Sequence, residues 1–204
     1  MLIRNTNAFI VINALFLWAI ASTSHAREIS YSYLESSYIT LTDSSRSEDV
    51  DATGFEAKGS FNLFEYLAIG ASVRGLAYDT INQREITQTN YALSLIGHVS
   101  VAQSTDLFLE ASALEQDLEI NFANDIFTAE YDENGYGVSL GVRHMLSQNI
   151  ELGAIVSQFD IFETNEQGNL NIRYYIGEQL SLGVAYTTGE DVDAYLFNVR
   201  FNIK

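Results

Sequence analysis

The sequence predicts an all-β fold, a ten-stranded antiparallel barrel in which each strand pairs with the next one along the chain. Three observations favour this fold. Apolar residues alternate with small or polar residues along most of the chain, a short turn motif recurs, and none of the 204 residues is proline. Alternation with a period of two is typical of a half-buried strand, and a chain without proline can form uninterrupted ladders of strand hydrogen bonds.

A recurring motif marks the tight turns between the strands. It reads apolar, any residue, Glu or Gln, any residue, apolar, any residue, apolar, Gly, and it occurs at 63–70, 146–153 and 176–183, with a looser and longer copy at 101–110. Four tight turns at one end, separated by longer segments at the other, describe a meander that can close into a barrel. We expect strands at 28–42, 51–63, 66–78, 90–102, 105–116, 135–146, 149–161, 168–177, 179–187 and 193–203.

The first 26 residues have the organisation of a cleaved export signal. Arg4 supplies a positive start, an apolar run follows at 8–21, and Ser24 and Ala26 are the small residues that precede a cleavage site. The alternative is a membrane-spanning helix, but the run is shorter than the ~20 residues that a span needs. We therefore expect a signal peptide at 1–26 and one mature domain, the barrel, at 27–204.

The expected strands have one apolar face and one polar face. In the second strand, for example, Phe55 and Phe61 alternate with Glu56 and Lys58. The apolar face would line a core in a soluble periplasmic barrel, whereas it would face lipid in a membrane barrel. The export signal, the absence of proline and cysteine, and aromatic residues near the ends of the apolar rows favour the membrane. We expect a transmembrane barrel of the outer membrane, with the tight turns and both termini in the periplasm and longer loops outside.

The first strand does not fit this pattern. Ile29, Tyr31 and Tyr33 alternate cleanly as an outward row, but the same parity then brings Glu35 to the lipid face. A carboxylate in lipid is costly, although the cost falls near the interface. Either Glu35 lies at the interface, or a β-bulge near Ser36 re-aims it. The sequence leaves both alternatives open.

The chain is acidic, and most of its carboxylates lie in expected external loops. The formal net charge of −17 argues against nucleic acid and anionic surfaces as general partners. The loops contain 19 of the 27 Asp and Glu residues, at 43–53, 79–90, 115–134, 160–168 and 188–193. These carboxylates either keep the loops solvated and repel neighbouring molecules, or they bind divalent cations weakly. Such cations would bridge the loops to lipid phosphates. No loop has the spacing of an EF-hand.

The most specific motifs are the segments SYSYLESSY at 30–38 and DATGFEAKGS at 51–60. With them, and with its strand rhythm, the mature chain resembles small bacterial outer-membrane β-barrels of the diffusible-signal-factor-regulated, porin-like and opacity-like type. The resemblance implies an outer-membrane location and no established enzymatic role. Such chains usually end on an aromatic residue that the barrel-assembly machinery recognises, whereas Ile203 and Lys204 stand at the end here.

No constellation of residues predicts catalysis. Outer-membrane enzymes need a base, usually His, beside Ser or Asp at the external rim. His98 and His144 both lie within a few residues of the tight turns, with His98 pointing into the lumen and His144 toward lipid. Neither can reach an external carboxylate, so we assign both a structural role. Because the chain also has no nucleotide, zinc or nucleophile motif, we predict no enzyme activity, no metal and no cofactor.

Inward parity gathers charged side chains in the lumen. Residues near the tight turns should form a belt rich in positive charge, made by Ser60, His98, Arg143, Arg173 and Arg200. The whole expected network comprises Glu56, Lys58, Arg74, His98, Glu110, Arg143, Arg173 and Arg200. If Leu63 faces Leu67 across the first turn, Glu56 lies opposite Arg74. Glu110 and Arg143 should lie at a similar height in the barrel, so we also expect these two side chains to be close together.

Two functions are compatible with such a barrel. The first is a non-enzymatic structural or surface-interaction protein, whose lumen is filled by ion pairs and whose external loops form the contact surface. The second is a narrow porin-like channel for small solutes, with the inward charges as its filter. The expected partners are outer-membrane lipid and the barrel-assembly machinery, with no nucleic acid.

Overall fold

The computed structural model describes residues 28–44, 50–81, 84–122, 128–161 and 163–203. The predicted signal peptide at 1–26 lies outside these residues. The described residues contain ten strands and no helix. None of them belongs to a helix that is long and apolar enough to cross a membrane.

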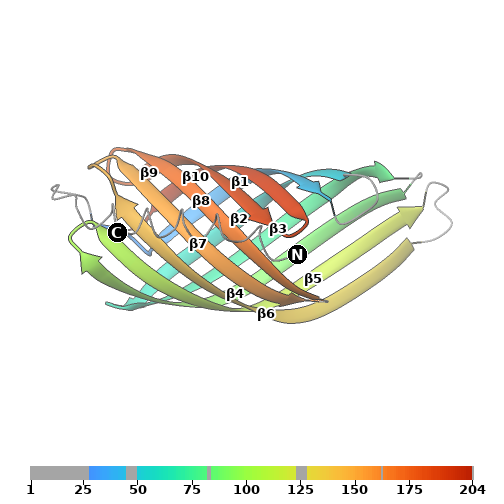
Figure 1. Ribbon diagram of the computed structural model, residues 1–204, viewed down its shortest axis with the longest axis horizontal. Coiled ribbons are helices and arrows are strands. Elements are labelled where there is room, and N and C mark those ends of the chain that lie inside the picture. Colours follow the sequence, from blue (N-terminus) through green and yellow to red (C-terminus); the bar gives the residue numbers. More distant parts are fainter. Residues whose placement is uncertain (1–27, 45–49, 82–83, 123–127, 162, 204) are drawn as a thin grey trace.

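The ten strands form one closed antiparallel barrel, shown in Figure 1. Each strand pairs with the next along the chain, and β10 returns to pair with β1. The predicted ten-stranded meander is therefore confirmed. The strands are β1 (Tyr33–Asp43), β2 (Val50–Phe64), β3 (Leu67–Ile81), β4 (Arg84–Ala102), β5 (Thr105–Phe122), β6 (Thr128–Met145), β7 (Ile150–Ile161), β8 (Glu163–Ile176), β9 (Leu180–Gly189) and β10 (Val192–Asn202).

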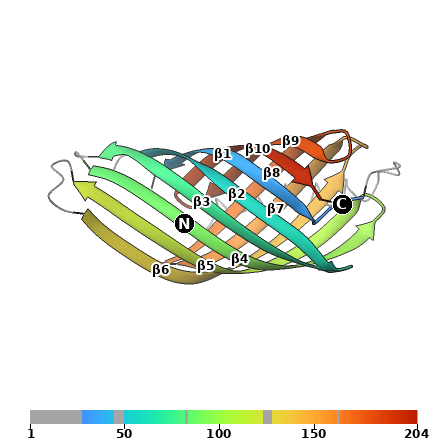
Figure 2. The same ribbon diagram turned by 180° about the vertical axis from the view of Figure 1, so that it is seen from behind.

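The strands β4, β5 and β6 are longer than the sequence predicts. They contain 19, 18 and 18 residues, and in Figures 1 and 2 their ends project beyond the shorter strands β7 to β10. Much of the expected acidic loops at 79–90 and 115–134 is therefore strand. The physical reason is that Ile86, Leu118 and Ile120 continue the period-two alternation between polar neighbours, and the acidic composition conceals this pattern.

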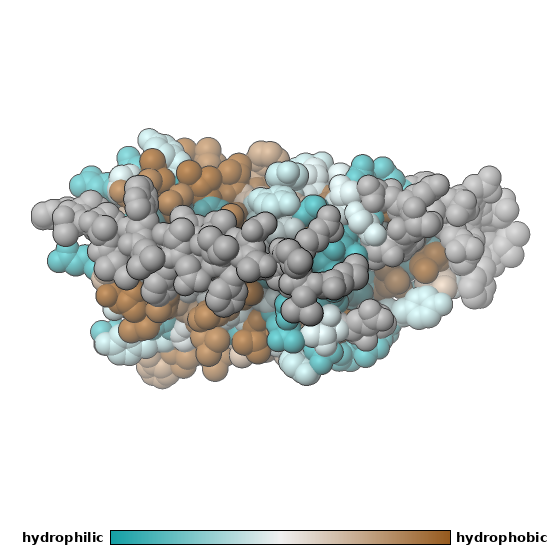
Figure 3. Space-filling view, viewed as in Figure 1, coloured by the Kyte–Doolittle hydropathy of each residue, from teal (hydrophilic) through white to brown (hydrophobic). Residues whose placement is uncertain are grey.

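The predicted apolar rows lie on the outside of the barrel. Phe55, Leu140 and Phe197 are 67%, 60% and 57% exposed, and they belong to strands on different sides of the barrel. On the face seen in Figure 3, hydrophobic surface gathers toward the end with the tight turns, and hydrophilic surface is more frequent toward the end where β4 to β6 project. We refer to that end as the loop end, and to the end with the tight turns as the turn end.

The side chains of the first strand point in directions that neither expected alternative describes. Tyr31 and Tyr33 are only 3% and 5% exposed, whereas Leu34 is 59% exposed, so the row of odd-numbered residues points into the lumen. The strand β1 pairs with β2 and β10 along Tyr33–Asp43 without a bulge. Glu35 therefore lies inside the barrel and not at the lipid interface. The rings of Tyr31 and Tyr33 resemble a lipid-facing row in the sequence, but in the structure they are lumen side chains.

Candidate functional site

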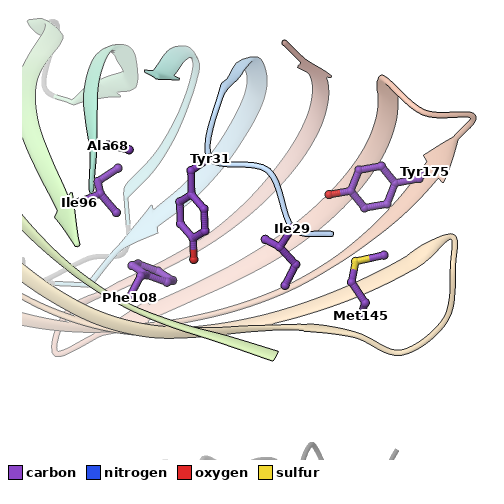
Figure 4. Packing of buried hydrophobic residues seen from close by; sticks show 7 residues of the cluster. All are labelled: Ile29, Tyr31, Ala68, Ile96, Phe108, Met145 and Tyr175. Atoms are coloured by element: carbon purple, nitrogen blue, oxygen red, sulfur yellow. The ribbon is translucent and has the colours of Figure 1, made fainter. Parts of the chain in front are cut away.

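An apolar plug fills the turn end of the lumen. The segment 28–32, which precedes β1, enters the barrel and places Ile29 and Tyr31 in a buried cluster (Figure 4). The other members come from strands around the wall: Ala68, Ile96, Phe108, Met145 and Tyr175. Gly141 leaves the room for this packing, because a Cβ atom there would collide with the Phe108 ring. We call these seven residues the plug.

Three hydrogen bonds hold the segment 28–32 against the barrel wall. The Arg143 guanidinium donates to the Ser30 carbonyl oxygen at 2.9 Å. The Asn62 backbone amide donates to Ser32 Oγ at 3.0 Å, and the Ile203 amide donates to the Ser32 carbonyl oxygen at 2.8 Å. The segment is thus fixed by contacts to β6, to β2 and to the end of the chain after β10.

The Tyr31 ring is packed on several sides. It stacks on the His98 imidazole, with 3.8 Å between the ring centroids and 10° between the planes. The Phe108 ring meets it edge-on at 6.4 Å, and the Arg143 guanidinium lies 4.9 Å from its centroid. Aromatic and cation–π contacts of this kind each contribute about 0.5–1.5 kcal/mol beyond the burial of apolar area.

A buried ion pair lies beside the plug. Arg143 donates from Nε and Nη2 to the two carboxylate oxygens of Glu151, at 3.0 and 2.9 Å. The Tyr175 hydroxyl donates to the same carboxylate at 2.6 Å. Glu151 is 1% exposed, so its charge is compensated almost entirely by these three donated hydrogen bonds. A bidentate contact of this kind fixes geometry as well as charge.

A second buried carboxylate joins two further arginines. Glu35 Oε2 accepts from Arg173 Nη2 at 2.6 Å and from Arg200 Nε at 2.7 Å. The Arg200 guanidinium also lies 3.9 Å from the centroid of the Tyr33 ring. These contacts tie β1 directly to its neighbour β10 and, across the lumen, to β8. Arg143, Arg173 and Arg200 all belong to the expected belt, and Glu35 and Glu151 are the carboxylates that form its ion pairs.

Two more ion pairs lie at mid-height. Glu56 and Arg74 are register partners, and Arg74 Nη2 donates to Glu56 Oε1 at 3.0 Å. Lys58 Nζ lies 3.9 Å from Glu110 Oε2, and this pair joins β2 to β5 across the lumen. The expected approach of Glu110 to Arg143 is wrong. The register of β5 and β6 sets Glu110 opposite Ser139, because shear shifts neighbouring strands along the barrel axis.

The charges inside the barrel balance. From the turn end to the middle of the lumen, the described strands place five basic side chains inward: Lys58, Arg74, Arg143, Arg173 and Arg200. Five acidic side chains share this region, namely Glu35, Glu56, Asp106, Glu110 and Glu151. Four of these carboxylates form ion pairs with the five basic side chains, since Glu35 contacts both Arg173 and Arg200, while Asp106 accepts a hydrogen bond from Ser100 Oγ.

Both histidines have packing partners among the described residues. His98 lies inside the turn end, where its Nε2 is 3.3 Å from Asn62 Oδ1. His144 shares the outward parity of Leu140 but is only 5% exposed, and its Nδ1 is 2.9 Å from Thr105 Oγ1. Among the described residues, no group of three or more His, Cys, Asp or Glu side chains could hold a metal ion.

A cavity of about 690 Å³ lies in the lumen. Part of its wall is polar, because Gln88 donates from Nε2 to Asn90 and Gln116 and accepts from the Tyr78 hydroxyl. Another part is apolar, formed by a cluster that includes Ile39, Leu41 and Leu76. This volume lies within the range of small-molecule sites in proteins, about 300–1,000 Å³.

Two residues that matter most were missed by sequence reasoning, although the sequence contains a signal for one of them. Glu151 occupies the sixth position of the turn motif, which Ala68 and Ser181 occupy in the other copies. All three are buried, so the sixth position points inward. Glu35 has no such signal, because its row of tyrosines looks like a lipid-facing row.

The chain belongs to the family described as the outer membrane protein beta-barrel domain, whose model matches residues 12–201. This membership agrees with the exposed apolar band and supports an outer-membrane location, with the band in lipid. Among the curated proteins, none matches the chain.

Solved structures share the fold at low sequence identity. The β-domain of the Bordetella autotransporter BrkA has a TM-score of 0.52 and 10% identity, covering 84% of this chain and 99% of its own. The translocator domain of the autotransporter NalP from Neisseria meningitidis has a TM-score of 0.52 and 11% identity, covering 97% of both chains. The porin NanC has a TM-score of 0.51 and 9% identity, covering 83% of this chain and 100% of its own.

Proposed function

We propose that this protein is a closed, non-enzymatic barrel of the outer membrane, with a structural or surface-interaction role at its loop end. The observation that carries the proposal is the plug. A solute that crosses the barrel must pass Tyr31, Met145 and Tyr175, which are 3%, 0% and 2% exposed. These side chains pack against each other and against buried ion pairs, so passage requires the packing to break.

The ion pairs beside the plug support closure as well. Each buried carboxylate is held by two or more donors, and removing either partner leaves a buried charge without compensation. An opening motion must therefore separate charged groups inside the barrel. This cost opposes spontaneous opening far more than an apolar packing contact alone.

The proposal also covers the insertion of the barrel into the membrane and includes no catalysed reaction. We assign insertion to the barrel-assembly machinery and the surroundings to outer-membrane lipid, as the family implies. The similarity of 30–38 and 51–60 to diffusible-signal-factor-regulated barrels stays a prediction. No catalytic role is assigned to His98 or His144.

A narrow porin-like channel is the second candidate, and the cavity of about 690 Å³ favours it. Conductance of the refolded protein in a planar lipid bilayer separates the two functions. We expect the mature protein to give no steady openings. The variant Ile29→Ala/Tyr31→Ala, which removes the two plug side chains contributed by 28–32, should give openings.

A matched control is Leu34→Ala/Tyr38→Ala, which changes two outward side chains of β1 and should stay silent. Folding of every variant is checked by its altered migration on a denaturing gel before and after boiling. Steady openings of the unaltered protein, equal in size to those of the plug variant, would overturn closure and establish the channel.

A further inference from the structure

The outer part of β6 has one open edge. The strand β5 pairs with β6 over its whole length, starting with Asn121 opposite Thr128. The strand β7 pairs with β6 only from Tyr136 opposite Asp160 onward. Among the described residues, the segment 128–135 therefore has no paired strand on the β7 side, where its last residue, Gly135, still lies against Asp160 and Ile161. An open edge presents unpaired backbone N–H and C=O groups, which can pair with another strand.

The outward face of this segment is acidic. Glu130 and Asp132 share the outward parity of Tyr136 and Val138, and all four are exposed. On the neighbouring strand β5, Glu119 lies opposite Glu130 and Asp117 lies opposite Asp132. Like charges directly opposite each other destabilise a sheet, because their Cβ atoms are only about 5 Å apart. A basic group that comes close to these rungs would relieve the repulsion.

The inward face of the same segment carries the apolar side chain of Ala129 and the aromatic side chain of Tyr131. Ala129 lies opposite Ile120, and Tyr131 lies opposite Leu118. Tyr131 is 53% exposed, so an apolar side chain placed beside it would gain contact area. From 129 to 132 the strand therefore alternates apolar inward residues with acidic outward ones, and Glu133, opposite Gln116, adds one carboxylate to the inward face.

We propose that the edge of β6 at 128–135 binds an extended basic segment of a partner protein, which adds to the sheet as a further strand. Backbone hydrogen bonds to the edge supply affinity, and side chains at alternate positions supply specificity. Lys or Arg at every second position lies beside Glu130 and Asp132, and apolar residues between them lie beside Ala129 and Tyr131. This inference rests on the proposed surface-interaction role and names the partner's chemistry.

A second copy of this chain is a poorer occupant of the edge. Pairing two β6 edges would bring Glu130 and Asp132 close to the same carboxylates of the other copy. Proteins use charges on exposed edges to prevent such self-association. The acidic edge therefore rejects its own copy and accepts a basic strand, which is specificity by repulsion as well as by attraction.

The experiment measures binding of fluorescent peptides to the refolded protein in zwitterionic detergent, by anisotropy. The first peptide is as long as 128–135 and alternates lysine with valine. The second has the same composition with all lysines before all valines. The third is the first peptide with N-methyl groups along one edge, which prevents strand addition without changing charge. We expect binding of the first peptide and at least about tenfold weaker binding of the other two.

Variants locate the site. Glu130→Lys/Asp132→Lys should weaken binding of the alternating lysine peptide by about tenfold or more, and should create binding of the corresponding glutamate–valine peptide. The matched control is Asp79→Lys/Glu85→Lys, which makes the same change in net charge on the strands β3 and β4, away from the β6 edge. We expect the control to change the affinity less than threefold.

Three results would overturn the inference. The lysine block peptide or the N-methylated peptide binds as tightly as the alternating peptide, which means that only charge is recognised. The edge and control variants lose equal affinity. Alternatively, the unaltered protein forms a dimer that Glu130→Lys/Asp132→Lys abolishes, which assigns the edge to a second copy. Each result leaves the closed lumen intact, because conductance tests the closure separately.

Discussion

The substitution Glu151→Ala tests the energetics of the plug most directly. Glu151 is 1% exposed and accepts three hydrogen bonds, two from Arg143 and one from the Tyr175 hydroxyl. Its removal leaves the Arg143 guanidinium buried beside the plug without its counter-charge. The hydrogen bond from Arg143 to the Ser30 carbonyl oxygen remains in this variant.

The expected cost follows from these contacts. All three bonds are made to the charged carboxylate, and a hydrogen bond to a charged group contributes about 1.5–3 kcal/mol, so the three bonds set an upper range of roughly 4.5–9 kcal/mol. Breaking a buried ion pair by removing one partner typically costs about 3–5 kcal/mol, because the other charge stays buried without compensation. We therefore expect Glu151→Ala to lower the free energy of unfolding by about 4 kcal/mol.

The double variant Arg143→Met/Glu151→Leu removes both charges and keeps most of the volume. It loses the Ser30 contact but leaves no uncompensated charge, so we expect a loss of at most about 2 kcal/mol. The control Glu110→Ala breaks a 3.9 Å contact between partly exposed groups and should cost less than about 1 kcal/mol.

Urea unfolding of the barrel in lipid vesicles, followed by circular dichroism, gives the free energies. Loss of less than about 1 kcal/mol in Glu151→Ala would refute the account of the plug as a charge-locked closure. A double variant that is as unstable as the single variant would refute the assignment of the cost to an uncompensated charge.

Three further predictions test the fold and the lumen. Folded protein should migrate differently from boiled protein on a denaturing gel, and identical migration would contradict a stable barrel. Glu56→Ala should lower the free energy of unfolding more than Glu56→Ala/Arg74→Ala does, by about 1 kcal/mol in urea unfolding, since the side chains are 13% and 38% exposed; equal losses would remove the role of compensation. His98→Ala should cost about 1 kcal/mol through the lost stack on Tyr31, and a hydrolytic activity that disappears in this variant would instead make His98 catalytic.

The fold could be predicted from the sequence because strand alternation and turn chemistry are local. Phe55 and Phe61 identify an outward row without any knowledge of the neighbouring strands. The register across the first turn is also local, so Glu56 and Arg74 could be aligned from the position of the turn alone. The lengths of β4 to β6 could not be predicted as well, because acidic residues occur both in loops and on the exposed face of projecting strands.

The partners within the lumen depend on non-local geometry. Glu35 meets Arg173 although 138 positions separate them, and Lys58 meets Glu110 across the lumen. Such contacts depend on barrel shear and on which strands face each other, and neither quantity is encoded in a single strand. The error over Glu110 and Arg143 has this origin, since equal distance from the turns does not give equal height in a sheared barrel.

The distribution of charge joins the two proposals. The chain has only ten Lys and Arg residues, and five of them are used inside the barrel against five carboxylates. The large negative charge of the chain therefore belongs to the parts outside this balanced lumen. On the projecting strands it appears as Glu119 opposite Glu130 and Asp117 opposite Asp132, and none of the ion pairs between described side chains includes these four carboxylates. Ion pairs inside the lumen favour a barrel that stays shut. The facing carboxylates outside favour a basic partner. The small number of basic residues in the chain therefore underlies both proposals.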